Sequence, residues 1–278
     1  MAPRCVFRWG MVAFLAGAAC GSDDPPASGT GSGSGSTGTG TTGTGGSGST
    51  GAMMPPMTTG DVFGPVHSGS YNDGPVDYAE TKYHNACAPA EKYAKQWQDL
   101  YGPYLGGVDN SLGADGSLCD ACALVTTRLG KSVLVRLVTY GVSKAPGDLD
   151  LSPEAYKVIY ERDPMGTPDL PRPMSWQLAR CPDKGNMYLE YQTGSNPYWT
   201  SFWVRNARLP IKSVESKKAK ETAFGKMNRE PHGPFTDPDG VGAGSFELRI
   251  TSTDGQTVTA TLGAPTPGAI VEAGVQFQ

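Results

Sequence analysis

Alternation of apolar and polar positions is clearest near the end of the chain. Apolar residues occupy every second position over 246–250, a Thr-Asp-Gly turn follows at 253–255, and alternation resumes over 257–262. Because successive side chains of a strand point to opposite faces, the pattern predicts a β-hairpin with one buried face. Alternation over 275–278 predicts a further, closing strand.

The middle of the chain predicts a mixture of strands and short helices. Two apolar segments, 121–127 and 132–139, are separated by a Leu-Gly-Lys turn at 129–131, which is typical of paired strands. Residues 90–101 carry Tyr, Trp and Leu at helical spacing and predict an amphipathic helix.

The segment 147–156, GDLDLSPEAY, predicts a strand followed by a helix. Two leucines alternate with Asp148 and Asp150, so we expect the leucines to point inward and the carboxylates outward. Ser152 is a typical N-cap, and the Pro and Glu that follow suit the first helical turn.

An aromatic cluster lies within 176–211, where one folded unit closes and another opens. Alternation predicts that Phe202 faces a core, while Trp199 and Trp203 share the opposite, solvated face next to Tyr198. Exposed rings in a row suit the apolar faces of sugars, or a partner protein, better than the exterior of a monomer.

Composition and the N-terminus limit the possible functions. The 278 residues carry a net charge of −4 and no basic stripe, which argues against nucleic-acid binding. Residues 1–20 resemble a bacterial lipoprotein signal with Cys20 as the lipidated residue; plain secretion is the alternative. Residues 21–60 are rich in Gly, Ser and Thr and predict a disordered linker. We therefore expect an extracellular or outer-membrane-surface protein.

Four cysteines lie beyond the linker, and they could be disulfide-bonded, metal-bound or redox-active. The histidines are scattered and a second CxxC is lacking, so we expect no metal and no cofactor. Export favours disulfides, with three possible pairings. These cysteines are Cys87, Cys119, Cys122 and Cys181.

Three blocks of the sequence together resemble the expansin family in its microbial form. They are 147–156 (GDLDLSPEAY), 175–182 (SWQLARCP) and 194–211 (GSNPYWTSFWVRNARLPI). The resemblance implies a mainly β protein: a six-stranded double-psi β-barrel over 62–184, then an immunoglobulin-like, carbohydrate-binding β-sandwich over 186–278.

The resemblance also implies roles for residues of the first unit. Ser70 and Tyr71 take the place of a Thr-aromatic pair that lines the polysaccharide groove, and Asp150 matches the groove carboxylate. Tyr140 stands where relatives carry a second aspartate, which puts a role for two carboxylates in doubt. The implied disulfides are Cys87 with Cys119 and Cys122 with Cys181.

In the second unit, the resemblance implies a row of aromatics that stacks on a glucan. Tyr198 and Trp199 match two of them. Trp203 could extend the row, or alternatively contact the first unit. The third family aromatic falls at Arg229, with Phe235 nearby.

The leading functional hypothesis is a monomeric protein that binds cell-wall polysaccharide, such as cellulose, xylan or peptidoglycan, and loosens it without hydrolysis. Glycosidases normally need two carboxylates. An endoglucanase using Asp150 and Asp73 is one alternative, although the Asn-Asp-Gly sequence favours Asp73 as a turn residue. A peptidoglycan-binding or lytic protein of the rare lipoprotein A type is another.

Overall fold

The computed structural model describes residues 62–73, 86–87, 101–141, 145–160 and 172–278. The expected signal and linker, and all but the last residue of the expected helix at 90–101, lie outside these ranges. Within them, no helix is long and apolar enough to cross a membrane.

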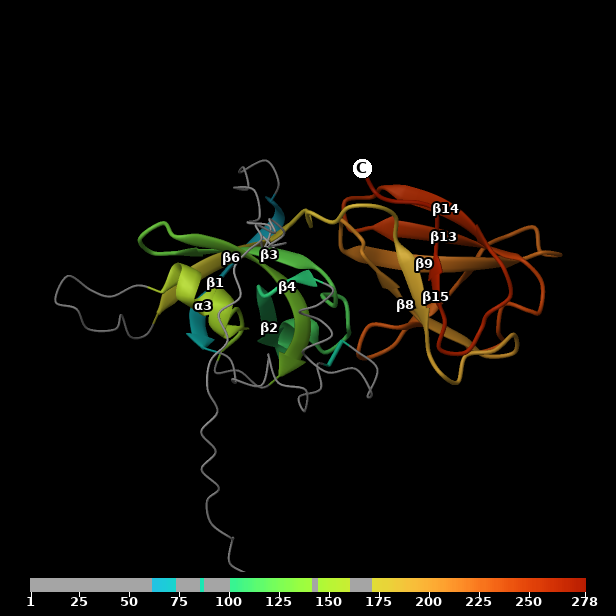
Figure 1. Ribbon diagram of the computed structural model, residues 1–278, viewed down its shortest axis with the longest axis horizontal. Helices are drawn as coiled ribbons and strands as arrows, with labels where there is room; N and C mark the ends of the chain where they lie inside the picture. Colours follow the sequence, from blue (N-terminus) through green and yellow to red (C-terminus); the bar gives the residue numbers. More distant parts are fainter. Residues whose placement is uncertain (1–61, 74–85, 88–100, 142–144, 161–171) are drawn as a thin grey trace, which may run out of the picture. The chain divides into compact units, whose positions relative to one another are not determined.

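Six strands close into a barrel in the order β1-β5-β2-β4-β3-β6 (Figure 1). Two neighbouring pairs, β1 with β5 and β2 with β4, are parallel, and the other pairs are antiparallel. The expected barrel is thus confirmed. Its strands are β1 (Val62–Asp73), β2 (Leu105–Asp109), β3 (Cys122–Thr127), β4 (Ser132–Gly141), β5 (Leu149–Leu151) and β6 (Pro173–Ala179).

Within the described residues, two short helices accompany the barrel, α2 (Asn110–Gly113) and α3 (Pro153–Ile159). Ser152 caps α3 as predicted: its Oγ accepts a hydrogen bond from the Ala155 amide at 3.4 Å. The same Oγ accepts from the Leu105 amide at 3.1 Å and donates to the Pro103 carbonyl at 2.6 Å. One fully buried hydroxyl therefore joins α3 to the start of β2.

The side-chain directions predicted for β5 and for the residue before it are confirmed only in part. Leu149 and Leu151 are fully buried, as expected, and Asp150 is half-buried. The outward orientation expected for Asp148 is wrong: this carboxylate is buried and accepts a hydrogen bond from the Ser70 amide at 2.7 Å. It is buried because a backbone donor of β1 replaces its water.

Trp176 fixes the barrel at the residue before Asp148. Its ring is buried, and its Nε1 donates to the Gly147 carbonyl at 2.9 Å. Gly147 has a φ of 93°, and a Cβ there would lie 2.4 Å from the Ser68 carbonyl oxygen. Only glycine therefore allows this close approach of β1.

The second part of the chain forms a sandwich of a four-stranded and a five-stranded sheet (Figure 1). Aromatic and aliphatic side chains of both sheets form one core, with Phe202 and Phe246 among its fully buried members. The sheets have the orders β10-β9-β13-β14 and β11-β12-β8-β7-β15. Their strands are β7 (Tyr188–Tyr191), β8 (Thr200–Arg205), β9 (Ile211–Lys218), β10 (Gly225–Lys226), β11 (Asn228–Arg229), β12 (Phe235–Asp237), β13 (Phe246–Ser252), β14 (Thr257–Leu262) and β15 (Ile270–Glu272).

The predicted hairpin is confirmed as β13 and β14, but the predicted closing strand is wrong. The sheet closes instead with β15, and residues 275–278 are not a strand. Gly274 has a φ of 69°, and the two amide-carbonyl bonds of Met187, to Ala273 and Val275, straddle it. The regular pairing of β15 with β7 ends before this glycine, although the Phe277 ring is still buried in the core.

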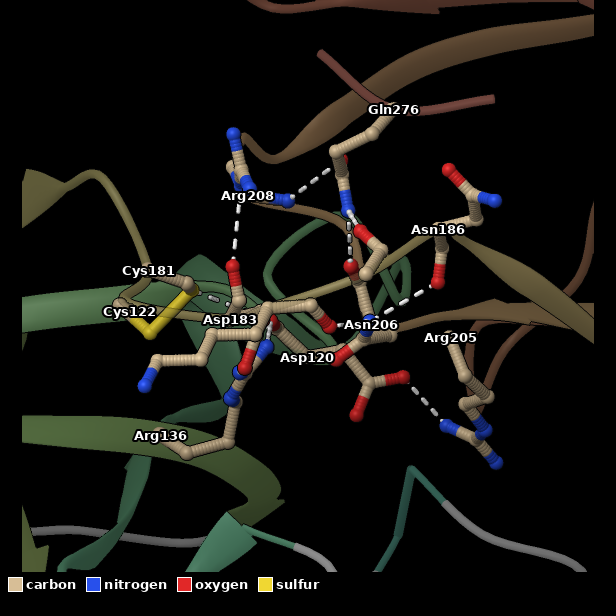
Figure 2. A network of polar contacts seen from close by, with 12 residues as sticks. Asp120, Cys122, Arg136, Cys181, Asp183, Asn186, Arg205, Asn206, Arg208 and Gln276 are labelled. Atoms are coloured by element: carbon tan, nitrogen blue, oxygen red, sulfur yellow. Dashed lines mark hydrogen bonds and ion pairs between the residues drawn. A yellow bond between two sulfur atoms is a disulfide. The ribbon is translucent and has the colours of Figure 1, made fainter. Parts of the chain in front are cut away.

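A network of buried charges connects β8 to the start of β3 (Figure 2). Arg205 forms ion pairs with Asp120 and with Glu190, the latter at 2.8 Å, and donates to the Cys87 carbonyl at 3.0 Å. Burial raises the pKa of Asp120, and the nearby Arg205 and Arg136 act against that rise. Arg136 also donates to the Asp120 carbonyl at 2.7 Å and pairs with Asp183.

Two disulfides join Cys87 to Cys119 and Cys122 to Cys181, which confirms the pairing that the family resemblance implied. They span 32 and 59 residues.

We predict that reduction of the two disulfides lowers the melting temperature, because each loop closure contributes about 4 kcal/mol on the chain-entropy model. Thiol alkylation of the oxidised protein should label none of these four residues. Labelling without reductant, or zinc in stoichiometric amount, would contradict the prediction.

We further predict that Arg205→Met lowers the free energy of unfolding by about 3–5 kcal/mol, because two buried carboxylates lose their partner. Arg249→Met is the matched control: Arg249 also pairs with a glutamate, Glu215, but is 39% exposed. Urea unfolding should show a much lower midpoint for the first variant and little change for the second. Equal midpoints in the two variants would show that the buried network is not stabilising.

Candidate functional site

Tyr198 and Trp199 lie in the turn that leads into β8. Tyr198 is 80% exposed, one of the most exposed large apolar or aromatic side chains in the described residues, and Trp199 is partly buried. An exposed ring that its own fold does not cover is available to a ligand. The exposure of Tyr198 is consistent with the expected aromatic surface, and ligand binding by the two residues stays a prediction.

Trp203 does not belong to that surface, so the expected outward exposure is wrong. It is 5% exposed, its Nε1 donates to the His232 carbonyl at 2.9 Å, and the Arg205 guanidinium lies 5.1 Å from its ring centre. Alternation did place Trp203 opposite the core residue Phe202. However, that end of the sheet is covered, since Arg205 itself is buried against Cys87 and Asp120.

The position of the third family aromatic offers no exposed ring either. The Arg229 guanidinium lies 4.5 Å from the centre of the Phe235 ring, and Phe235 is only 3% exposed. Arg229 also donates to the Gly116 carbonyl at 3.2 Å and to the Ile211 carbonyl. Among the residues expected to form the surface, Tyr198 is exposed, Trp199 is partly buried, and Trp203 and Phe235 are buried.

In the barrel, Asp150 lies on β5 between β1 and β2. Its backbone pairs with Asn72 on one side and Gly107 on the other. Asp73 is the last residue of β1 and pairs with Leu151, and the turn expected there continues into residues outside the described ranges. The fold therefore brings the backbones of Asp73 and Asp150 to adjacent strands, one register position apart.

The two residues expected near the start of the groove differ in exposure. Ser70 is partly exposed, and its amide is held by Asp148. Tyr71 is 2% exposed; its ring packs 5.7 Å from that of Tyr156, and its hydroxyl donates to the Ile159 carbonyl at 3.2 Å. The expectation that Tyr71 binds polysaccharide is therefore wrong, because α3 covers the ring.

Tyr140 makes a contact that sequence reasoning missed. Its hydroxyl lies 3.1 Å from His232 Nδ1, and the two rings stack with their centres 5.8 Å apart. His232 has a φ of 73°, which is unusual for a non-glycine residue. No local pattern could have paired residues 92 positions apart. The place of the family's second groove aspartate thus holds a Tyr-His pair.

Metal binding gains no support from the described residues, in which no three His, Cys, Asp or Glu side chains form a metal-binding group.

Comparisons with known proteins find similarity to expansin-like proteins in both sequence and structure. No family model matches the chain. Expansin-like protein 6 of Dictyostelium discoideum is 28% identical over 167 residues, which are 58% of this chain and 56% of that protein. The chain thus spans little more than half the length of this relative.

The structure of apo expansin from Clavibacter michiganensis superposes with a TM-score of 0.59 at 20% identity, over 77% of this chain and 98% of that one. A mutant of the same expansin in complex with cellohexaose gives equal values. These likenesses show the fold. Taken with the three sequence blocks, the barrel, the sandwich and the curated relative, they identify the chain as an expansin-like protein.

Proposed function

We propose that this protein binds a cellulose-like glucan on the surface formed by Tyr198 and Trp199. The observation that carries the proposal is the exposed Tyr198 ring beside Trp199, at the edge of an expansin-like sandwich. The apolar faces of β-linked glucose stack on aromatic rings because stacking removes the apolar surfaces of both partners from water. The Clavibacter expansin that was crystallised with cellohexaose supports this ligand class.

We also propose that wall loosening proceeds without hydrolysis. Hydrolysis normally needs two carboxyl groups about 5 to 9.5 Å apart across the scissile bond. Asp150 supplies one, but the family's second groove position holds Tyr140, which contacts His232. Asp150 then acts as a hydrogen-bond acceptor for sugar hydroxyls, with Ser70 as a second polar contact.

Hydrolysis is the alternative function. In a hydrolase, Asp150 would serve as the acid and Asp73 as the base or nucleophile. The two backbones lie on neighbouring parallel strands, but Asp73 pairs with Leu151 and not with Asp150, and successive residues of a strand point to opposite faces. This register disfavours the hydrolase.

We further propose the wider setting of the protein. Residues 1–20 act as an export signal, Cys20 carries a lipid anchor unless the protein is freely secreted, and 21–60 form a tether. The folded domains are 62–184 and 186–278, acting as a monomer outside the cell. Pull-downs on cellulose, xylan and peptidoglycan would identify the polymer.

Trp199→Ala should weaken binding to insoluble cellulose by about 1–3 kcal/mol, the range for aromatic stacking contacts, and Tyr198→Ala should act in the same direction. Depletion isotherms with the whole protein give the affinities. The matched control is Trp203→Phe, which alters a buried ring and should leave binding unchanged. Unaltered affinity in both Trp199→Ala and Tyr198→Ala would show that glucan binds elsewhere.

Asp150→Asn should abolish wall weakening in an extension assay while cellulose binding stays nearly unchanged. Asp115→Asn, at an exposed aspartate of the same barrel, should behave as wild type. No reducing ends should appear with any of these proteins. Reducing ends that increase with protein, and vanish in both Asp150→Asn and Asp73→Asn, would establish the hydrolase instead.

A further inference from the structure

We propose that Asn196 is a positioning residue that presets the direction of the Tyr198 and Trp199 rings before any polysaccharide arrives. This inference rests on the proposed function, because it assigns the device that prepares that same surface. Tyr198 is 80% exposed, so packing against the rest of the protein holds little of its side chain. The backbone of the turn therefore sets the position and the Cα–Cβ direction from which the ring projects.

The Asn196 side chain holds both ring-bearing residues by their backbones. Its Oδ1 accepts hydrogen bonds from the Tyr198 amide at 2.9 Å and from the Trp199 amide at 3.1 Å. Its Nδ2 donates to the Gly194 carbonyl at 3.1 Å, which anchors the side chain on the preceding residues. An asparagine that bonds amides two and three positions ahead mimics a backbone turn and fixes its geometry.

The backbone of Asn196 closes the same turn. Its amide donates to the Trp199 carbonyl at 2.8 Å, and its carbonyl accepts from the Thr200 hydroxyl at 2.9 Å. Thr200 is fully buried at the start of β8, and its Oγ1 also accepts from the Val241 amide at 3.2 Å. The turn is thus tied to the first residue of a core strand.

A second segment supports the turn from behind. The Gly242 amide donates to the Pro197 carbonyl at 2.9 Å. Gly240 has a φ of 64°, and a Cβ there would lie 2.1 Å from the Pro197 carbonyl oxygen. Any side chain at Gly240 would therefore displace the residue that immediately precedes Tyr198.

This support reduces the cost of binding. A rigid surface gives up little conformational freedom when a glucan settles on it, whereas a loose turn must be ordered at the expense of affinity. Asn196 touches the backbones of the ring-bearing residues and not their rings, so it acts through Tyr198 and Trp199. Its effect on affinity should consequently depend on the presence of those rings.

The first experiment measures amide hydrogen exchange and needs no ligand. Asn196→Ala should speed exchange at the Tyr198 amide about tenfold or more, because this amide loses its acceptor, and should speed it less at the Trp199 amide, which keeps a 3.3 Å bond to the carbonyl of residue 196. Asn196→Asp keeps a side-chain oxygen at the same position and should restore most of the protection. Asn186→Ala, which removes a partly exposed asparagine bonded to Glu272, is the control and should change neither amide.

The second experiment measures cellulose binding in a mutant cycle with the whole protein. Asn196→Ala should weaken binding about three- to tenfold, as expected when fixed groups become mobile, and Asn196→Asp should bind close to wild type. In a Tyr198→Ala/Trp199→Ala background, Asn196→Ala should have no further effect. Gly240→Ala should weaken binding in the same ring-dependent way, by displacing Pro197.

The outcomes separate the inference from the proposed function. Unchanged exchange at both amides in Asn196→Ala, or a loss of binding that persists without the rings, would overturn the positioning role. A wild-type protein that binds no polysaccharide would overturn the proposed function instead, while the exchange data would still decide whether Asn196 fixes the turn. A global loss of fold in Asn196→Ala would appear as faster exchange throughout the sandwich and would also contradict a local role.

Discussion

The two faces of β8 determine how the second part of this protein is built. Even-numbered side chains, such as Phe202, enter the core between the sheets, and odd-numbered ones face the other way. At the far end of that outer face, Arg205 is fully buried and needs Asp120 and Glu190 to neutralise it. A buried cation without partners would cost several kcal/mol, so the ion pairs are a condition of the fold. Before the opposite end of the same strand, Tyr198 is exposed and Trp199 is partly buried.

The barrel meets a comparable constraint on β5, where two carboxylates two residues apart have different surroundings. Asp148 is held by the Ser70 amide, and Gly147 beside it lets β1 approach closely. Asp150 is only half-buried. The first carboxylate is therefore a structural acceptor, and the second is the one that the family resemblance assigns to the groove.

The sequence predicted what depends on local pattern and missed what depends on distant contacts. Periodicity located the β13–β14 hairpin, and the Ser152 cap followed from its own neighbours. Alternation oriented Trp203 correctly but could not reveal that its face is covered, because the covering residues lie elsewhere in the chain. Tyr71 was misassigned for a similar reason, because the sequence of β1 does not show which face of the strand α3 covers. The disulfide pairing came from the family resemblance, since spacing alone left three choices.

Binding at the Tyr198–Trp199 turn and bond cleavage at Asp150 in the barrel have different physical requirements. Stacking of a sugar on rings needs exposure and a fixed direction, and both are present at the turn that Asn196 holds. Bond cleavage asks more, because a single carboxylate cannot both protonate the leaving group and activate the attacking group. Where relatives carry a second acid, this chain has Tyr140, whose hydroxyl bonds to His232. The proposal of loosening without hydrolysis rests on this replacement of a carboxylate by a tyrosine.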